Sequence, residues 1–319
     1  MHVVVATHGH CFDGLASAVV FTRLVRKIEG EKAAFTYRAC GYGEGQLTPT
    51  DDVLSGDQNA VLDYRFAPTD RLTWYFDHHR TAFADASERE MFARRESTGR
   101  FFYEPAYTSC TKLVCEVAQD KFGVGLTGLE DLVHWADVID SAAFKNPEEA
   151  LDRSNPVMRL AAVVERYGDD KLLSELVPKL LERPLTEIAR LPEMEKRYGK
   201  IAAQHERFVE RVRARAVQKG RVVMVDLTDE ALEMIGKFVT YALYPHAVYS
   251  VIVGLMKNAT KISVGYNPWS GMPCDVDISA ICARYGGGGH PFVGAVQFGR
   301  QEIARAREVA LEIATELAG

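Results

Sequence analysis

The stretch FDHHR places a carboxylate and two imidazoles side by side, at Asp77, His78 and His79. The residues before them, LTWYF, are apolar and aromatic with no helical period, which is typical of a short strand buried on both faces. The three polar side chains therefore emerge together at the end of a predicted strand.

Polar side chains also stand at the ends of two other predicted strands. His8 follows HVVVAT, and Asp63 ends AVLD. Taken singly, each is readily explained as a surface group or a helix cap. Their joint placement favours a divalent metal site, because imidazole and carboxylate suit manganese, iron or zinc, and clustered carboxylates repel each other without a cation. Two such ions would generate a hydroxide nucleophile and hold a phosphoryl oxygen.

The elements that must position these residues alternate between strand and helix. The first part of the chain reads HVVVAT, GLASAVVFTRLVRKIEG, AAFTYRA, AVLDY and LTWYF. This alternation predicts an α/β fold with a mostly parallel, doubly wound sheet and helices on both faces. Ligands of such sheets bind outside the carboxyl ends of the strands, which is where the polar residues fall.

The rest of the chain is first helical and then mixed. Helical periodicity extends from about 109 to 219 and includes a charged helix over 195–220, which we interpret as a solvated connection in preference to a nucleic-acid contact. Strand patterns return in RVVMVDL, YSVIVGLM, KISVGYN and AVQFG. We predict a metal-binding catalytic domain over 1–150, a helical connector over 151–219 and a smaller α/β substrate-binding domain over 220–319.

Bulk composition restricts the partners. The 319 residues are 47% hydrophobic with a formal net charge of -6, so the chain has no global positive field for long nucleic acid. Its six scattered cysteines form no C-x-x-C pair, which argues against a structural zinc site or a disulfide scaffold. No membrane-spanning stretch or secretory segment is recognisable, and we expect a cytoplasmic protein, with monomer and homodimer both open.

Several blocks together resemble the DHH phosphoesterases. FDHHR resembles their signature, THGHCFDGLASA the first block, VLDY the second and HWADVIDSAAF the fourth, while YGGGGHPFVGA resembles the G-G-G-H of the DHH-associated substrate domain. The blocks keep the family's order from residue 3 to about residue 298. The superfamily includes nano-RNases, exopolyphosphatase-related proteins and RecJ-like enzymes.

The resemblance implies a set of functional residues. Two divalent ions, usually Mn²⁺, would be held by His8, Asp13, Asp63, His78 and an Asp of the fourth block, with Asp63 as the bridging carboxylate. Asp77 would orient an imidazole. His79 would lie near the substrate phosphate or the leaving oxygen, and Arg80 would either contact phosphate or remain a surface residue.

Two departures from the family pattern leave ligands open. Cys11 stands where many members have a carboxylate, so that one ion would be held by His10 or Cys11 or bound more weakly, unless the cysteine simply packs. The fourth block offers Asp137, which fits the RecJ-type branch, or Asp140, which fits D-T-G-x-F as DSAAF. Three residues apart on a helix, both could face one side. We prefer Asp137 and keep both.

The glycine-rich stretch suggests a phosphate contact. Gly286, Gly287, Gly288 and Gly289 follow a predicted helix and could form an anion nest of backbone N–H groups, although a flexible helix end is the simpler alternative. His290 directly after it and Arg284 one turn earlier favour a terminal phosphate or a base. Asn267, within GYNPWSGMP, could hydrogen-bond a base, while the nearby Trp269 stacks on it or covers a core edge.

These features predict a metal-dependent phosphoesterase with a short nucleotide substrate: a few ribonucleotides, a linear dinucleotide or a nucleoside bisphosphate. A polyphosphate hydrolase is the alternative within enzymes. Cys11 motivates a third possibility, a nucleotide-binding protein whose catalytic site has decayed.

Overall fold

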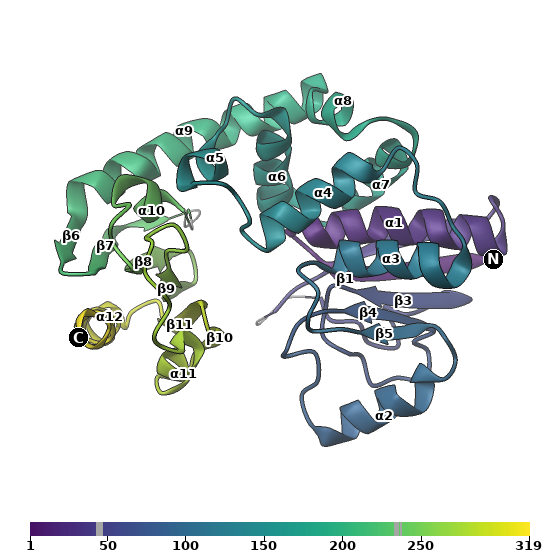
Figure 1. Cartoon of the computed structure of the whole chain (residues 1–319), viewed down its shortest axis with the longest axis horizontal. Helices are drawn as coiled ribbons and strands as arrows, with labels where there is room; N and C mark the ends of the chain where they lie inside the picture. The colour runs from purple at the N-terminus through teal and green to yellow at the C-terminus, as the bar shows by residue number, and fades with distance from the viewer. Residues whose placement is uncertain (43–46, 233–235, 237) are drawn as a thin grey trace. The chain divides into compact units, whose positions relative to one another are not determined.

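The computed structural model describes residues 1–42, 47–232, 236 and 238–319, without the side chain of His290 (Figure 1). The chain divides into two compact units, Met1–Phe144 with Arg153–Tyr198, and Lys145–Asp152 with Gly199–Gly319. The expected connector over 151–219 is therefore shared, because 153–198 belongs to the first unit and 199–219 to the second.

The first unit contains a five-stranded sheet in the order β2-β1-β3-β4-β5. Its strands are β1 (His2–His8), β2 (Ala34–Cys40), β3 (Gln58–Leu62), β4 (Trp74–Asp77) and β5 (Phe101–Tyr103). All four pairings are parallel, which confirms the predicted sheet. The edge strand β5 was not anticipated, because three residues are too short to show a period.

Helices cover both faces of this sheet, as predicted. The unit contains α1 (Phe12–Glu29), α2 (Ala86–Glu96), α3 (Cys110–Phe122), α4 (Glu130–Asp140), α6 (Pro156–Tyr167), α7 (Asp170–Glu182) and α8 (Leu185–Ala189). Figure 1 shows α1 and α3 on one face and α2 on the other. The central strands are thus buried from both sides, which explains their continuous apolar runs, such as the fully buried Trp74, Tyr75 and Phe76.

Strand register brings the polar residues to one edge. Thr7 pairs with Leu62, and Leu62 pairs with Phe76, so that the residues that follow, His8, Asp63 and Asp77, lie at the same level of the carboxyl edge. Gly14 permits the first turn of α1 to approach this edge. A Cβ there would lie 2.2 Å from the His8 carbonyl oxygen. Only glycine allows this approach without a shift of the backbone.

The second unit is built on a six-stranded mixed sheet in the order β10-β11-β9-β8-β7-β6. Its strands are β6 (Ala216–Lys219), β7 (Val222–Leu232), β8 (Tyr249–Met256), β9 (Ala259–Tyr266), β10 (Gly288–His290) and β11 (Val293–Gly299). Only the β7–β8 pair is parallel among these described pairings. The unit also contains α5 (Pro147–Leu151), α10 (Val239–Leu243), α11 (Ile278–Ala283) and α12 (Ile303–Ala318), and α12 packs on β7 and β8.

The long charged helix is shorter than predicted. It is α9 (Pro192–Arg215), and the residues expected to continue it form β6. β6 pairs with β7 through backbone hydrogen bonds, and that tertiary pairing overrides the helical pattern of Ala216–Lys219.

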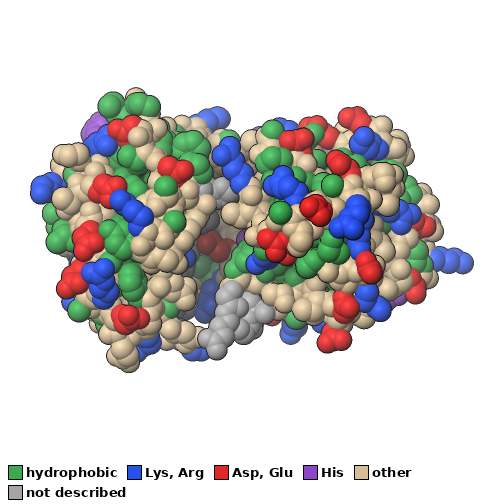
Figure 2. Space-filling model, turned by 90° about the horizontal axis from the view of Figure 1, so that it is seen from below, with side chains coloured by type: hydrophobic (Ala, Val, Ile, Leu, Met, Phe, Trp, Pro, Cys, Tyr) green, Lys and Arg blue, Asp and Glu red, His purple; other side chains and the backbone are tan. Residues whose placement is uncertain are grey.

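Acidic and basic side chains are interspersed on the face of the molecule that Figure 2 shows. On the face seen in Figure 2, Lys and Arg lie between Asp and Glu instead of forming one continuous basic track. Across the described part of the chain, none of the helices combines the length and apolarity needed to span a membrane.

Candidate metal centre

Seven side chains meet at the carboxyl edge of the first sheet and form the candidate metal centre. They fall into three overlapping groups: His8, Cys11 and Asp63; Asp63, His78 and His79; and Asp13, His78 and Asp140. Within each group the potential ligand atoms lie within 4.8 Å of one another. Asp63 and His78 each belong to two groups, so the groups join into one centre. We call the first group the His8 position and the third the His78 position.

Asp63 lies between the two positions. Its Oδ2 is 3.7 Å from Nδ1 of His8, while its Oδ1 is 3.6 Å from Nε2 of His78. These separations are too long for hydrogen bonds. Two ligand atoms that each lie about 2.1 Å from a shared ion are roughly 3.0–3.6 Å apart. The two separations at Asp63 are close to that range. The two carboxylate oxygens thus face different imidazoles, as a bridging ligand requires.

The polar atoms at the middle of the centre are buried without hydrogen-bond partners. Asp63 is 1% exposed, and neither of its carboxylate oxygens, nor Nε2 of His78, has a partner among the residues the structure describes. A buried carboxylate left in this state costs several kcal/mol unless a cation compensates it. Asp63 also has a φ of 54°, a left-handed conformation that is uncommon outside glycine. The donor set therefore fits a divalent cation.

A backbone contact orients His78. Its Nδ1 lies 3.1 Å from the carbonyl oxygen of Tyr107, so Nδ1–H donates there and Nε2 faces the carboxylates. This arrangement is usual for a metal-binding histidine. Nε2 lies 3.3 Å from Asp140 and 3.9 Å from Asp13. Burial lowers the pKa of His78, but the carboxylates of Asp63, Asp140 and Asp13 outweigh it and raise the pKa to about 10.

Asp13 is fixed by the amino terminus of α3. Its two oxygens accept from the backbone N–H groups of Cys110 and Thr111, at 2.7 and 3.0 Å. Burial raises the pKa of Asp13 well above its usual value, and the nearby carboxylates of Asp63 and Asp140 raise it further. Burial also raises the pKa of Asp63, but the surrounding imidazoles lower it by more. Without a metal ion, Asp13 thus resists ionisation, whereas Asp63 is ionised beside the imidazoles.

Asp77 orients His79 and not the metal-facing His78. Its Oδ1 accepts from Nδ1 of His79 at 2.7 Å, and its Oδ2 accepts from the hydroxyl of Tyr75 at 3.1 Å. Burial lowers the pKa of His79, but Asp77 and Asp63 raise it to about 9. Arg80 lies exposed in the following turn, with no hydrogen bond or ion pair to any described residue.

Of the two carboxylates of the fourth block, only Asp140 reaches the centre. Asp137 accepts hydrogen bonds from the hydroxyls of Thr108 and Ser109 and lies 3.7 Å from Nζ of Lys112. It therefore fixes the start of α3. This geometry runs against our preference for Asp137, because the rotation of α4 directs the two side chains to different neighbours.

Cys11, and not His10, lies beside the ions' expected place. Burial raises the pKa of the Cys11 thiol well above its usual value, and the carboxylates of Asp63, Asp140 and Asp13 raise it further. His10 has a φ of 57°, is exposed, and its Nδ1 lies 3.2 Å from the Glu165 carbonyl oxygen. His10 belongs to none of the three ligand groups found among the described residues.

Sequence reasoning missed two neighbours of the centre. One is the Tyr107 carbonyl, which no sequence pattern could reveal because every residue carries one. The other is Tyr42, whose ring stacks on Tyr64 at 4.5 Å and lies edge-on to His8 at 5.7 Å. Tyr64 is buried, whereas Tyr42 is 54% exposed.

No protein-family model matches the sequence, and no curated protein matches it. A solved structure, the pGpG-specific phosphodiesterase PggH from Vibrio cholerae, is 18% identical over 99% of both chains with a TM-score of 0.66. The DHH domain of a protein described as a member of a ribosomal protein family is 13% identical with a TM-score of 0.62, over 99% of this chain and 86% of that one.

The chain has the DHH-type fold. RecJ from Thermus thermophilus, in complex with Mn²⁺, supports the same conclusion at 10% identity and a TM-score of 0.61. The match covers 99% of this chain but 52% of the RecJ chain. At these identities the likeness concerns the fold alone.

The substrate residues expected in the second unit are engaged elsewhere. Asn267 is fully buried: its Nδ2 donates to the carbonyls of Pro245 and Ala247 at 3.1 and 2.9 Å, and its Oδ1 accepts from the Trp269 amide at 3.1 Å. Arg284 pairs with Glu316 of α12. Both side chains hold loops or helices of their own unit.

The first two amides of the glycine-rich segment are already bonded within the fold. The amides of Gly286 and Gly287 donate to the carbonyls of Ala283 and Cys282 at the end of α11, at 3.1 and 3.0 Å. Gly288 and Gly289 lie in β10, which pairs with β11. A Cβ on Gly287 would lie 2.1 Å from the Ala295 carbonyl oxygen, so close packing explains that glycine. The side chain of His290 lies outside the described part of the structure.

Proposed function

We propose that the chain is a divalent-metal-dependent phosphoesterase that hydrolyses short nucleotide substrates. The observation that carries the proposal is the Asp63 carboxylate, buried and without hydrogen-bond partners among the described residues, with one oxygen toward His8 and the other toward His78. A carboxylate so placed suits a bridge between two divalent ions, which lie about 3.5–4 Å apart in two-metal hydrolases.

The two positions offer different ligands. His8 and Asp63 would hold one ion, and Asp13, His78 and Asp140 would hold the other, with Asp63 shared between them. The nitrogen and oxygen donors of the His78 position suit Mn²⁺. When bound, such ions lower the pKa of a water molecule and neutralise charge on a phosphoryl group.

His79 is the candidate proton donor. Asp77 and Asp63 raise the pKa of His79, which favours the protonated ring, and Asp77 fixes the ring through Nδ1. The ring then presents Nε2–H as its second donor, to a phosphate oxygen or to the leaving oxygen. Asp77 acts through His79 as a positioning residue.

The surface supports a short substrate. The net charge is -6, so the chain has no global positive field for the phosphates of a long strand, and on the face seen in Figure 2 basic side chains are interspersed with acidic ones. The half-exposed ring of Tyr42 beside His8 could stack on one base. Among proteins of this fold, PggH is a pGpG-specific phosphodiesterase and RecJ is an exonuclease.

The test is release of mononucleotide from pGpG, followed by chromatography. Protein stripped of metal should be inactive and should regain activity with Mn²⁺. His78→Ala removes a metal ligand, and metal ions contribute several kcal/mol to catalysis. The substitution should therefore lower the rate by roughly 10²–10⁴-fold. His134→Ala, an exposed histidine on α4, serves as the matched control and should retain the wild-type rate.

Two outcomes would overturn the proposal. Orthophosphate release from polyphosphate without any hydrolysis of pGpG would establish the phosphoanhydride alternative. Nucleotide binding with no metal-dependent turnover of either substrate would establish a binding protein.

A further inference from the structure

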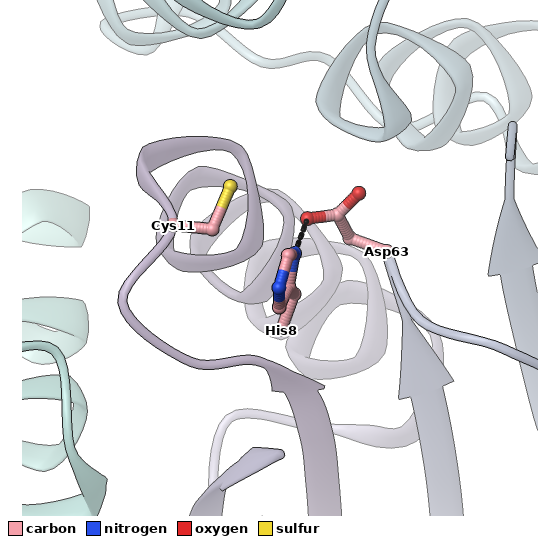
Figure 3. A group of neighbouring side chains, drawn as sticks. All are labelled: His8, Cys11 and Asp63. Carbon is pink, nitrogen blue, oxygen red and sulfur yellow. Dashed lines mark ion pairs between the residues drawn. The ribbon is translucent and has the colours of Figure 1, made fainter. Parts of the chain in front are cut away.

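The His8 position contains a thiol. Figure 3 shows His8, Cys11 and Asp63 converging from the end of β1, the start of α1 and the end of β3. Their potential ligand atoms lie within 4.8 Å of one another. Asp63 gives independent support for a ligand here. It is 1% exposed, and its oxygens have no hydrogen-bond partner among the described residues. A buried acceptor aimed at this place indicates a bound cation, and the sulfur lies next to it.

Helix capping does not account for Cys11. It is the N-cap residue of α1, a position where Ser, Thr, Asp or Asn is favoured because a side-chain oxygen accepts from the first turn. The Gly14 N–H acts on the sulfur, but sulfur is a weak acceptor, and the thiol makes no side-chain cap hydrogen bond.

Apolar packing does not account for Cys11 either. Its Sγ lies within 4.8 Å of a ligand atom of His8 and of Asp63, so an imidazole and a buried carboxylate lie beside the sulfur. A thiol gains little in such surroundings, whereas a thiolate bound to a cation is stabilised there.

The two positions therefore differ in donor atoms: the His8 position has a soft sulfur donor, and the His78 position has only nitrogen and oxygen donors. The His8 position combines one imidazole, one sulfur and one carboxylate, whereas the His78 position combines one imidazole and two carboxylates. Thiolate ligands favour ions such as Zn²⁺, while oxygen-rich sets favour Mn²⁺ or Mg²⁺.

We propose that Cys11 Sγ is a metal ligand and that it makes the His8 position selective for a thiophilic divalent ion, Zn²⁺ in preference to Mn²⁺. The inference rests on the proposed two-ion centre. On binding, the thiol proton passes to solvent and the sulfur lone pair is donated to the ion, with no change of oxidation state.

Cobalt reports this ligand directly. Metal-stripped protein is titrated with Co²⁺ while the near-ultraviolet absorption is recorded, because cobalt bound to thiolate shows a sulfur-to-metal charge-transfer band. The band should appear in the wild type and in the matched control Cys115→Ser, whose cysteine lies in α3 outside the three ligand groups. It should be absent in Cys11→Ser and Cys11→Asp.

Metal competition then measures selectivity. Loss of a residue that merely orients a ligand lowers metal affinity about 10–100-fold, so Cys11→Ser, which removes a ligand, should lower Zn²⁺ affinity at least 10-fold. Cys11→Asp should shift the preference toward Mn²⁺. X-ray absorption of the Zn²⁺-loaded wild type tests the ligand without a variant. The spectrum should contain one sulfur scatterer at about 2.3 Å from zinc in addition to oxygen and nitrogen scatterers.

The failures are distinguishable. Cobalt bound by the wild type without the charge-transfer band, or a Zn²⁺ shell free of sulfur, would refute the role of Cys11 and leave the phosphoesterase proposal intact. A stripped protein that binds neither Co²⁺, Zn²⁺ nor Mn²⁺ would overturn both.

Discussion

Two parts of the molecule contain polar residues at places where sequence predicts a ligand, and the structure treats them in opposite ways. In the first unit, the carboxylate oxygens of Asp63 and Nε2 of His78 are buried, and none of them has a hydrogen-bond partner among the described residues. In the second unit, Asn267 and the amides of Gly286 and Gly287 already bond within their own fold. Since buried polar groups are nearly always paired, an unpaired cluster is the better indicator of a ligand site than residue type.

The sharpest test of this comparison is a pair of substitutions three residues apart. Asp140→Asn removes a candidate ligand of the His78 position and should lower kcat/KM on pGpG by about 10²–10³-fold, since several kcal/mol of metal stabilisation are at stake. Asp137→Asn keeps a side chain that can accept from Thr108 and Ser109, and its rate should stay within about 3-fold of the wild type. Equal losses would contradict the assignment.

A smaller loss is expected from the residue behind His79. Asp77→Asn should lower kcat by about 10–100-fold, as removal of an orienting partner typically does. Asp77 raises the pKa of His79, so its removal lowers that pKa. The pH–rate profile of the variant should fall on the alkaline side at a lower pH than that of the wild type, because Asp77 no longer raises the pKa of His79. An unchanged alkaline limb would exclude His79 as the proton donor.

Metal binding should release protons. The pKa of His78 is about 10 in the metal-free centre, so at pH 7 its imidazole is protonated and an ion must displace that proton. Metal affinity should therefore increase as the pH rises toward 10. Calorimetric titration at pH 7 in two buffers of different ionisation enthalpy measures the protons released. Heats that do not depend on the buffer would show that His78 is not a ligand.

The smallest effects are expected in the second unit. Asn267→Ala leaves buried partners unsatisfied and should cost about 1–3 kcal/mol of unfolding free energy, measured by urea denaturation. Arg284→Ala breaks an exposed ion pair and should cost less than about 1 kcal/mol. Neither residue belongs to the candidate metal centre, so neither substitution should change KM by more than about 3-fold, or about 0.6 kcal/mol. A 10-fold rise in KM for Arg284→Ala would show instead that the second unit contributes to substrate binding.

The fold and the edge of the sheet were predictable from local sequence. His8, Asp63 and Asp77 each follow an apolar run, and parallel strands place such residues at one edge whatever the details of the helices. β5 and β6 were missed because both are short and owe their strand form to a partner, β4 and β7 respectively.

The glycine-rich segment shows the limit of motif reasoning. Consecutive glycines permit an anion nest, but they equally permit the close pairing of β10 with β11 that the structure contains. Composition alone could not distinguish the two, because both need the same freedom of the backbone.

The sequence by itself determined the parallel sheet and the identity of the histidines and carboxylates at its carboxyl edge, since strand period and residue type are local properties. Only the tertiary structure decided which atoms face each other. The rotation of α4 places Asp140, and not Asp137, beside His78. The Tyr107 carbonyl turns Nε2 of His78 toward Asp63, and the first turn of α1 brings Cys11 beside His8. These choices depend on how separate elements pack, and no single stretch of sequence encodes that packing.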